Sequence, residues 1–319
     1  MSSSKGRTPT LTTAGLGGLE EYGRYLREEQ DLSAPTLRNY LSDLRHFAAW
    51  CECCWSEGED EALPFDPAAV TIPTITAYRS HLRTVLGLKP ATINRRLVTL
   101  KRYFGWAQET GIASSDPAKA VRLVPSVPKP PRHLDDREEA ALVAAVTRYG
   151  TPRDRALIVT ALHTGLRAEE LCGLRREHVR INRRSGHLEV YGKRSKHRVV
   201  PLNSTARETL EEYMKGLPDV APCLFPSRKG GAGEAGTGRP APITPRALSY
   251  IVSRYAALAK VEGISPHDLR HRFGYRMADK VPLHRLAQIM GHDSLDTTMI
   301  YVKGTGADLQ AAVEEIAWA

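Results

Sequence analysis

The sequence predicts a mainly helical α+β protein with one small antiparallel β-hairpin in its second half. Three observations lead to this prediction. Apolar residues recur at helical spacing along most of the chain. Residues 186–202, "GHLEVYGKRSKHRVVPL", carry two short β-prone runs around a polar turn. The 319 residues, of which 41% are hydrophobic, are enough for about two domains with cores of their own.

The first domain is predicted to be a helical bundle over residues 15–123, after a polar, Gly-rich tail at 1–14. Its first helix runs from about Leu16 to Arg27. Ser33 is a plausible N-cap for the second helix. The apolar faces of the next three helices contain Leu37, Tyr40, Leu41, Leu44, Phe47 and Ala48; then Ile75, Tyr78, Leu82 and Val85; then Ile93, Leu97, Leu100 and Phe104.

The fourth helix also has a polar face that favours nucleic acid. Phosphates and base edges are suitable partners for its side chains, Asn94, Arg95, Arg96, Lys101 and Arg102. The alternative is a solvated helix face. The net charge of +9 and the pI of about 9.4 favour an acidic partner, and nucleic acid ranks before membrane. No apolar run approaches the roughly 20 residues that span a membrane, and no signal peptide is evident. We therefore expect a cytoplasmic, nucleoid-associated protein.

The second domain is predicted at 134–319, after a proline-rich linker at 124–133, "VPSVPKPPRH". Helices are expected at 135–149 and 152–164, before the hairpin, and at 204–216 after it. A Gly-rich stretch, "SRKGGAGEAGTGRPAP", interrupts the pattern before helices resume. The last helix, "ADLQAAVEEIAWA", is amphipathic.

Metal sites are not indicated. The chain has five cysteines, three of them in "CECC", which is too crowded for a tetrahedral site and is predicted to be a helix with reduced cysteines. His267 and His271 have zinc-like spacing, but Asp268 stands where the zinc motif has glutamate, and Arg270 between them disfavours a cation.

Four clusters in the second domain carry the candidate chemistry. In "HTGLRAEEL", Gly165 ends one helix and Arg167 starts the next, which suits phosphate binding, although an ion pair with Glu170 is the simpler interpretation. The hairpin turn holds several cations, of which Arg194, Lys196 and Arg198 are predicted to bind the nucleic-acid backbone; the alternative is a solvated turn. The other two clusters are "SPHDLRHRF" and "GHDSLDTTMIY". The candidate catalytic or DNA-binding side chains of these three clusters are Lys193, Arg194, Lys196, Arg198, His267, Arg270, His271, His292 and Tyr301.

This set suits metal-free chemistry on a phosphodiester. Guanidinium groups can bind the non-bridging oxygens and stabilise charge in the transition state. A tyrosine oxygen can attack the phosphorus, with histidine as base and lysine as proton donor.

The chain resembles the tyrosine recombinases of the phage-integrase family, which include Xer-type enzymes. The resemblance rests on "TGLRAEEL", "GKRSKHRVVPL", "HDLRH" and "MGH…Y", in this order and spacing. It implies that Arg167 and Arg270 bind phosphate, that His267 assists proton transfer, that His292 positions the phosphate, and that Tyr301 is the nucleophile. Supporting roles are implied for Glu170 and His271. Lys193 matches the general acid, but Arg194 replaces a usual glycine, so Lys196 stays open as an alternative.

The resemblance also implies the architecture and the reaction. An N-terminal SAM-like core-binding domain and a catalytic domain would clamp double-stranded DNA that carries inverted-repeat core sites. Two protomers would bind each site and four would form the active homo-tetramer, with the C-terminal helix docking in trans. Strands would exchange through a 3′-phosphotyrosine and a Holliday junction, without cofactor, metal or ATP.

Three alternatives remain open at this point: a type IB topoisomerase, a DNA-binding protein without catalysis, and a zinc hydrolase. Integration, transposition, resolution and cassette exchange share one chemistry, so the biological role is not predicted.

Overall fold

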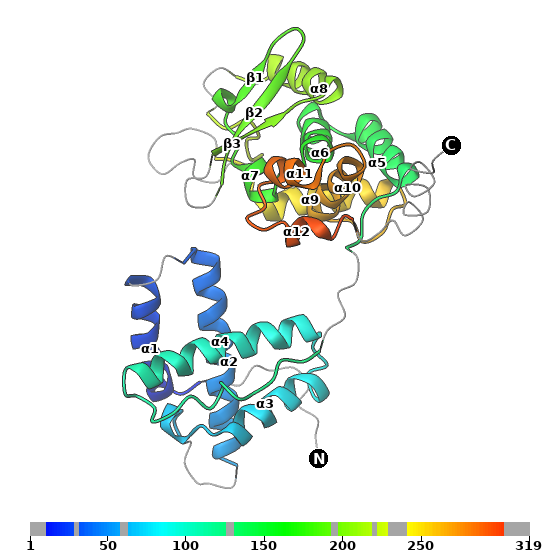
Figure 1. Cartoon of the computed structure of the whole chain (residues 1–319). Helices are drawn as coiled ribbons and strands as arrows, with labels where there is room; N and C mark the ends of the chain where they lie inside the picture. Colours follow the sequence, from blue (N-terminus) through cyan, green and yellow to red (C-terminus); the bar gives the residue numbers. More distant parts are fainter. Residues whose placement is uncertain are drawn as a thin grey trace, which may run out of the picture. The chain divides into compact units, whose positions relative to one another are not determined.

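The computed structural model describes residues 11–28, 32–57, 63–125, 131–192, 197–218, 222–228 and 241–302. Over these residues the protein is mainly helical with one small antiparallel sheet, as predicted (Figure 1). The chain divides into two compact units, which we call the N-terminal unit (residues 1–128) and the C-terminal unit (residues 129–319).

The N-terminal unit is a bundle of α-helices around an aromatic core. The helices are α1 (Thr13–Glu28), α2 (Ala34–Trp55), α3 (Ile72–Thr84) and α4 (Pro90–Glu109), with a short 3₁₀ turn, η1, at Pro67–Ala69. The largest buried side chains at its centre are aromatic: Tyr22, Phe47, Tyr78, Tyr103 and Phe104. These rings come from all four helices, so their packing holds the bundle together.

Local signals fix where these helices begin. Ser33 is the N-cap of α2, as predicted, followed by a proline in the first turn. Thr71 caps α3 in a reciprocal pair with Thr74. One core prediction was wrong: Val85 is 69% exposed, because α3 ends at Thr84 and the buried face ends with Leu82.

The C-terminal unit consists of helices packed beside a three-stranded sheet, which lies at one edge of the unit (Figure 1). The elements are α5 (Asp136–Tyr149), α6 (Pro152–Thr164), α7 (Ala168–Cys172), η2 (Arg176–His178), β1 (Val179–Ile181), β2 (Gly186–Tyr191), β3 (His197–Pro201), α8 (Ser204–Lys215), α9 (Pro245–Leu258), α10 (Pro266–Ala278), α11 (Leu283–Met290) and α12 (Asp296–Met299).

The predicted hairpin is β2 and β3, and β1 adds a third strand that the sequence analysis did not predict. The order is β1-β2-β3, all antiparallel. Leu188 pairs with Val200 on the buried face, whereas Glu189 pairs with Val199 and Tyr191 with His197 on the outer face. Strand β1 is three residues long, too short to show a clear alternation of apolar and polar residues.

Two glycines shape the chain where the functional segments meet. Gly165 ends α6 and Gly291 ends α11, with φ values of +60° and +66°. Side chains other than glycine rarely adopt this left-handed backbone. A Cβ at Gly165 would also lie 2.3 Å from the ring of Phe273, so α6 and α10 approach each other closely here.

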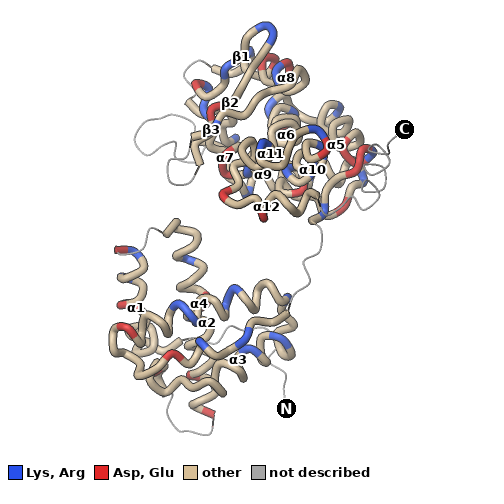
Figure 2. The backbone as a smooth tube through the Cα atoms, viewed as in Figure 1, with Lys and Arg blue, Asp and Glu red and all other residues tan. Residues whose placement is uncertain are grey.

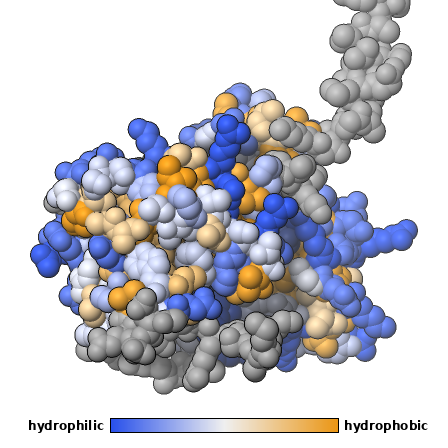
Figure 3. Space-filling model, turned by 90° about the horizontal axis from the view of Figure 1, so that it is seen from below, coloured by the Kyte–Doolittle hydropathy of each residue, from blue (hydrophilic) through white to orange (hydrophobic). Residues whose placement is uncertain are grey.

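Three further features of the protein concern its cysteines, the apolarity of its helices and its surface. The cysteines of α2 are free, and Cys51 is buried in the helical core. Among the described residues, no helix is both long and apolar enough to cross a membrane. On the face shown in Figure 3, hydrophobic residues are interspersed among hydrophilic ones.

Candidate active site

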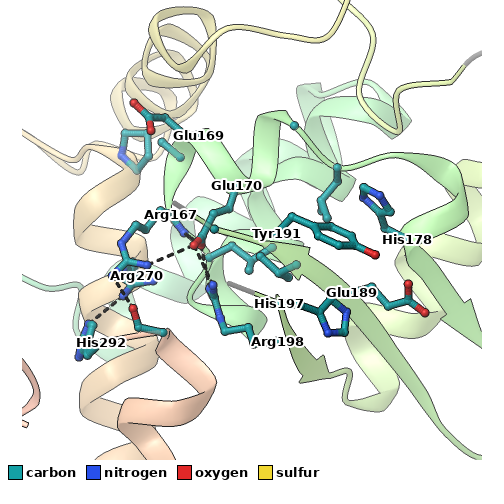
Figure 4. A pocket seen from close by; sticks show the side chains of 18 of the residues that line it. Arg167, Glu169, Glu170, His178, Glu189, Tyr191, His197, Arg198, Arg270 and His292 are labelled. Atoms are coloured by element: carbon teal, nitrogen blue, oxygen red, sulfur yellow. Dashed lines mark hydrogen bonds and ion pairs between the residues drawn. The ribbon is translucent and has the colours of Figure 1, made fainter. Parts of the chain in front are cut away.

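A pocket of about 960 Å³ in the C-terminal unit brings together segments that are far apart in the sequence (Figure 4). It is lined by the loop that joins α6 to α7, by β2 and β3, by the start of α10 and by the end of α11. Of the candidate side chains, those that line the pocket are Arg167, Glu170, Arg198, His267, Arg270 and His292.

Glu170 organises one wall of this pocket. Its carboxylate accepts two hydrogen bonds from Arg198, both of 2.8 Å, and one of 3.1 Å from the Arg167 guanidinium. The backbone N–H of Arg167 donates a further bond of 2.8 Å. Burial opposes ionisation of Glu170, but these donors outweigh it and lower the pKa of the carboxyl group. Glu170 is therefore a buried anion that fixes two arginines.

Arg167 and Arg198 differ in what they leave accessible. The Arg167 side chain is 46% exposed and also donates to the Gly291 carbonyl at 2.7 Å. The Arg198 side chain is only 13% exposed, and its Nε donates to the Ile289 carbonyl at 2.9 Å. Arg167 therefore faces the pocket, whereas Arg198 ties β3 to α11.

Arg270 lies at the base of the pocket, on α10. It is buried and donates to the carbonyl groups of Gly165 and Met290, the latter at 2.9 Å. Burial, with help from the neighbouring Arg167 charge, lowers the pKa of Arg270 to about 10. The guanidinium therefore stays cationic at neutral pH.

The hydrogen bonds of His292 define its tautomer. The Arg270 guanidinium lies 2.8 Å from His292 Nε2, and an arginine can only donate, so Nε2 is the acceptor. Nδ1 then carries the proton and donates to Thr298 Oγ1 at 2.8 Å. Burial and the charge of Arg270 lower the pKa of His292 to about 4, which keeps the ring neutral.

Tyr301 lies beside the pocket but is withdrawn from solvent. It is 2% exposed and packs with Phe273, Leu286 and Met290. Its hydroxyl is 3.1 Å from His271 Nδ1. Burial raises the pKa of Tyr301 to about 12 even though Arg270 opposes the shift. The hydroxyl is therefore held protonated inside the unit.

The two histidines of "HDLRH" occupy different places. His267 lines the pocket, and its ring centroid is 4.2 Å from that of His271. His271 is the one that contacts the Tyr301 hydroxyl. Burial lowers the pKa of both rings, that of His271 to about 4. The sequence analysis gave His267 the proton-transfer role, whereas the ring in contact with the tyrosine is His271.

Comparison with known proteins identifies the family. Residues 132–306 match the phage integrase family, and residues 19–111 match its N-terminal SAM-like domain. Tyrosine recombinase XerC of Xanthomonas campestris pv. campestris (strain B100) is 31% identical over 93% of this chain and 89% of its own length. XerC of Mycobacterium sp. (strain KMS) is 32% identical, over 93% and 97%. The chain belongs to the phage integrase family of tyrosine recombinases. It is a Xer-like site-specific recombinase, an enzyme that breaks and rejoins DNA.

The fold of this recombinase is shared with solved relatives. The structure of the XerH site-specific recombinase bound to difH substrate has a TM-score of 0.69 and 19% identity, over 97% of this chain and 99% of that one. The matched N-terminal SAM-like domain argues against the topoisomerase alternative. Among the described residues, no group of three or more histidine, cysteine, aspartate or glutamate side chains could hold a metal ion.

Several predicted residues lie outside the described residues of the recombinase. These are the three cations at the tip of the hairpin, Lys193, Arg194 and Lys196, and the C-terminal helix. The choice between the two lysines as general acid stays a prediction.

The polar face of α4 is largely engaged within the N-terminal unit. Asn94 makes two hydrogen bonds to the backbone of Val124, of 2.8 and 2.9 Å. Arg95 and Arg96 both pair with the buried carboxylate of Asp43. Lys101 donates to two backbone carbonyls, and Arg102 stacks on the Tyr40 ring. Figure 2 shows that Lys and Arg residues occur along α4. These contacts within the unit hold the polar side chains of α4 in place. Arg95 still has 43% of its side chain exposed to solvent.

The role of Arg198 was missed by sequence reasoning, which grouped it with the hairpin cations. A signal was present, because strand side chains alternate between faces. Arg198 lies on the same face as Val200, which is fully buried, and opposite to His197 and Val199, which are exposed. An arginine on the buried face needs a buried anion.

Proposed function

We propose that this recombinase cleaves double-stranded DNA by attack of Tyr301 on a phosphate held by Arg167 and Arg270, and positioned with the help of His292. The observation that carries the proposal is the convergence of these three side chains on one pocket, with a buried tyrosine beside it. The basic net charge of +9 agrees with a polyanionic partner.

The arginines supply the charge stabilisation. Attack on a phosphodiester places extra negative charge on the non-bridging oxygens, and preorganised cations in a partly dry pocket stabilise it strongly. Arg270 is anchored by two backbone carbonyls and His292, and Arg167 by Glu170 and the Gly291 carbonyl. His292 therefore acts here by orienting Arg270 rather than by carrying charge.

Tyr301 has to leave its buried position before it can react. The O–P bond forms at the tyrosine oxygen while the bond from phosphorus to the 5′ oxygen breaks. In the buried position the Tyr301 hydroxyl contacts His271 Nδ1, which can accept a proton when that ring carries its own proton on Nε2. His271 takes the tyrosine proton as the O–P bond forms, so the two side chains have to stay in contact when Tyr301 moves. The departing 5′ oxygen takes a proton from the general acid, Lys193 or Lys196. Binding of DNA and of further protomers would supply the free energy that displaces the tyrosine.

Strand exchange follows from the same chemistry. The freed 5′ hydroxyl attacks the phosphotyrosine of a partner duplex, first giving a Holliday junction and then resolving it. This requires dimers on inverted half-sites that pair as a tetramer, with the N-terminal unit binding the core DNA and the C-terminal helix docking in trans. The division into a tail (1–14), a DNA-binding domain (15–123), a linker (124–133) and a catalytic domain (134–319) is part of this proposal.

A nicked suicide substrate that carries the recombinase's own site tests the proposal. The wild type should form a covalent protein–DNA adduct, and Tyr301→Phe should bind DNA but form none. Tyr275→Phe is the matched control, because its ring centroid lies 5.2 Å from that of Tyr301. Arg167→Ala and Arg270→Ala should each slow cleavage by about 100-fold or more. An adduct that persists in Tyr301→Phe would show that another residue is the nucleophile.

A further inference from the structure

Three rings form a row on the outer face of the sheet. The centroid of Tyr191 is 5.1 Å from that of His178 and 5.0 Å from that of His197. Tyr191 and His197 are directly paired across β2 and β3, and His178 immediately precedes β1. Tyr191 is 55% exposed although its ring contacts both histidines. The three rings together form an accessible aromatic surface.

This row belongs to the same pocket as the phosphate-binding arginines. His178, Tyr191 and His197 line it together with Arg167 and Arg270 (Figure 4). The volume of about 960 Å³ is near the upper end of the roughly 300 to 1,000 Å³ found for small-molecule pockets. One phosphate group would fill a small part of this space. The pocket therefore has room for a nucleoside next to the phosphate, with the rings along one side.

The chemistry of the row suits a nucleobase. The arginines satisfy the phosphate oxygens, whereas an aromatic ring offers a π face, on which bases of any sequence can stack. The nearby carboxylate of Glu189 is paired with Arg180 at 3.4 Å, which limits its repulsion of the DNA backbone. Within a duplex both faces of a base are covered by neighbouring bases. A base at a newly broken strand end can unstack and expose one face.

We propose that Tyr191, flanked by His178 and His197, is a stacking platform for the first base of the strand released with a 5′ hydroxyl. This inference rests on the proposed function, because only cleavage by the recombinase creates that strand end. The platform holds the unstacked nucleotide close to the phosphotyrosine, so it favours capture of an incoming 5′-hydroxyl strand. It confers no sequence preference, because stacking is tolerant of base identity.

A strand-joining experiment tests the platform. The covalent adduct is first trapped on a suicide substrate, and a 5′-hydroxyl strand is then supplied at subsaturating concentration. The first nucleotide of that strand carries either a base or an abasic site, and the ratio of the two joining rates is measured. In Tyr191→Ala this ratio should be smaller than in the wild type by about 5-fold or more, as expected for the loss of one stacking contact.

Matched variants make the result specific. Tyr191→Phe should keep the wild-type ratio, whereas Tyr191→Leu, which keeps apolar bulk but no ring, should lose it. Tyr149→Ala should also keep it, because Tyr149 is equally exposed at 55% but ends α5, outside the pocket. Equal ratios in the wild type, Tyr191→Ala and Tyr191→Leu, with normal adduct formation, would overturn the platform alone. Absence of the adduct in the wild type would instead overturn the proposed function, and the platform with it.

Discussion

Addition of one methyl group at Gly274 is predicted to destabilise the C-terminal unit through Tyr301. Gly274 is in α10, and a Cβ built there would lie 2.5 Å from Tyr301 Cζ and 2.6 Å from Cε1. These separations are far below a normal carbon–carbon contact of about 3.5 to 4.0 Å. Gly274→Ala therefore forces the Tyr301 ring, or the helix, to move.

Two opposing terms set the size of the effect. Overpacking a close-packed site costs about 1 to 3 kcal/mol. Alanine is the better helix former, which offsets about 1 kcal/mol of that cost. The net loss in the free energy of unfolding should be about 0 to 2 kcal/mol when the ring is present. When Tyr301 is replaced by alanine, the clash disappears, and Gly274→Ala should stabilise the unit by about 1 kcal/mol.

Urea unfolding of four variants measures the coupling between the two positions. Gly274→Ala is made in a Tyr301→Phe background, which keeps the ring atoms that clash, and in a Tyr301→Ala background, which removes them. The effect of the methyl group should differ between the two backgrounds by about 1 to 3 kcal/mol. The same effect in both backgrounds would refute the conclusion that the Tyr301 ring is packed on Gly274.

Three further predictions concern the pocket wall and its pH dependence. Glu170→Gln should lower stability by on the order of 3 kcal/mol and slow cleavage, because it leaves the buried guanidinium of Arg198 without its anion. The exposed neighbour control Glu169→Gln should leave stability unchanged. Melting temperatures and adduct yields measure both effects. Gly291→Ala should cost more stability in urea unfolding than Gly87→Ala. Gly291 and Gly87 both have φ near +60°, but of the two only Gly291 would place the methyl group 2.8 Å from a nitrogen of the Arg198 guanidinium. An equal loss of stability in the two variants would argue against that contact. Burial and the charge of Arg270 lower the pKa of His292 to about 4, below its unfolded value of about 6.5. As the pH drops, the unfolded chain therefore binds a proton at this histidine before the folded protein does. The free energy of unfolding should fall as the pH drops from 6.5 toward 4. The melting temperature of His292→Gln should fall less over that range than the melting temperature of the wild type.

The helices and the order of the functional segments were predictable from the sequence because they depend on local physics. Helical spacing of apolar residues located α2 and α4, and Gly165 placed the end of α6. The family resemblance came from short motifs in a fixed order, each readable within a few residues. Strand β1 was missed because three residues carry too little pattern to separate a strand from a loop.

The tertiary structure decided which partner each charged or reactive group has. Periodicity cannot show that Arg198 meets Glu170, 28 positions away, or that Arg270 meets the Gly165 carbonyl, 105 positions away. Nor does periodicity show that two arginines of α4 form ion pairs with Asp43. The sequence by itself determined the order and spacing of the motifs, and from them it predicted that a tyrosine, two arginines and histidines of this recombinase act together. Only the packed C-terminal unit decided that the Tyr301 hydroxyl is buried, stays protonated and contacts His271. The physical reason is that burial and hydrogen bonding depend on atoms that the chain brings together from distant positions.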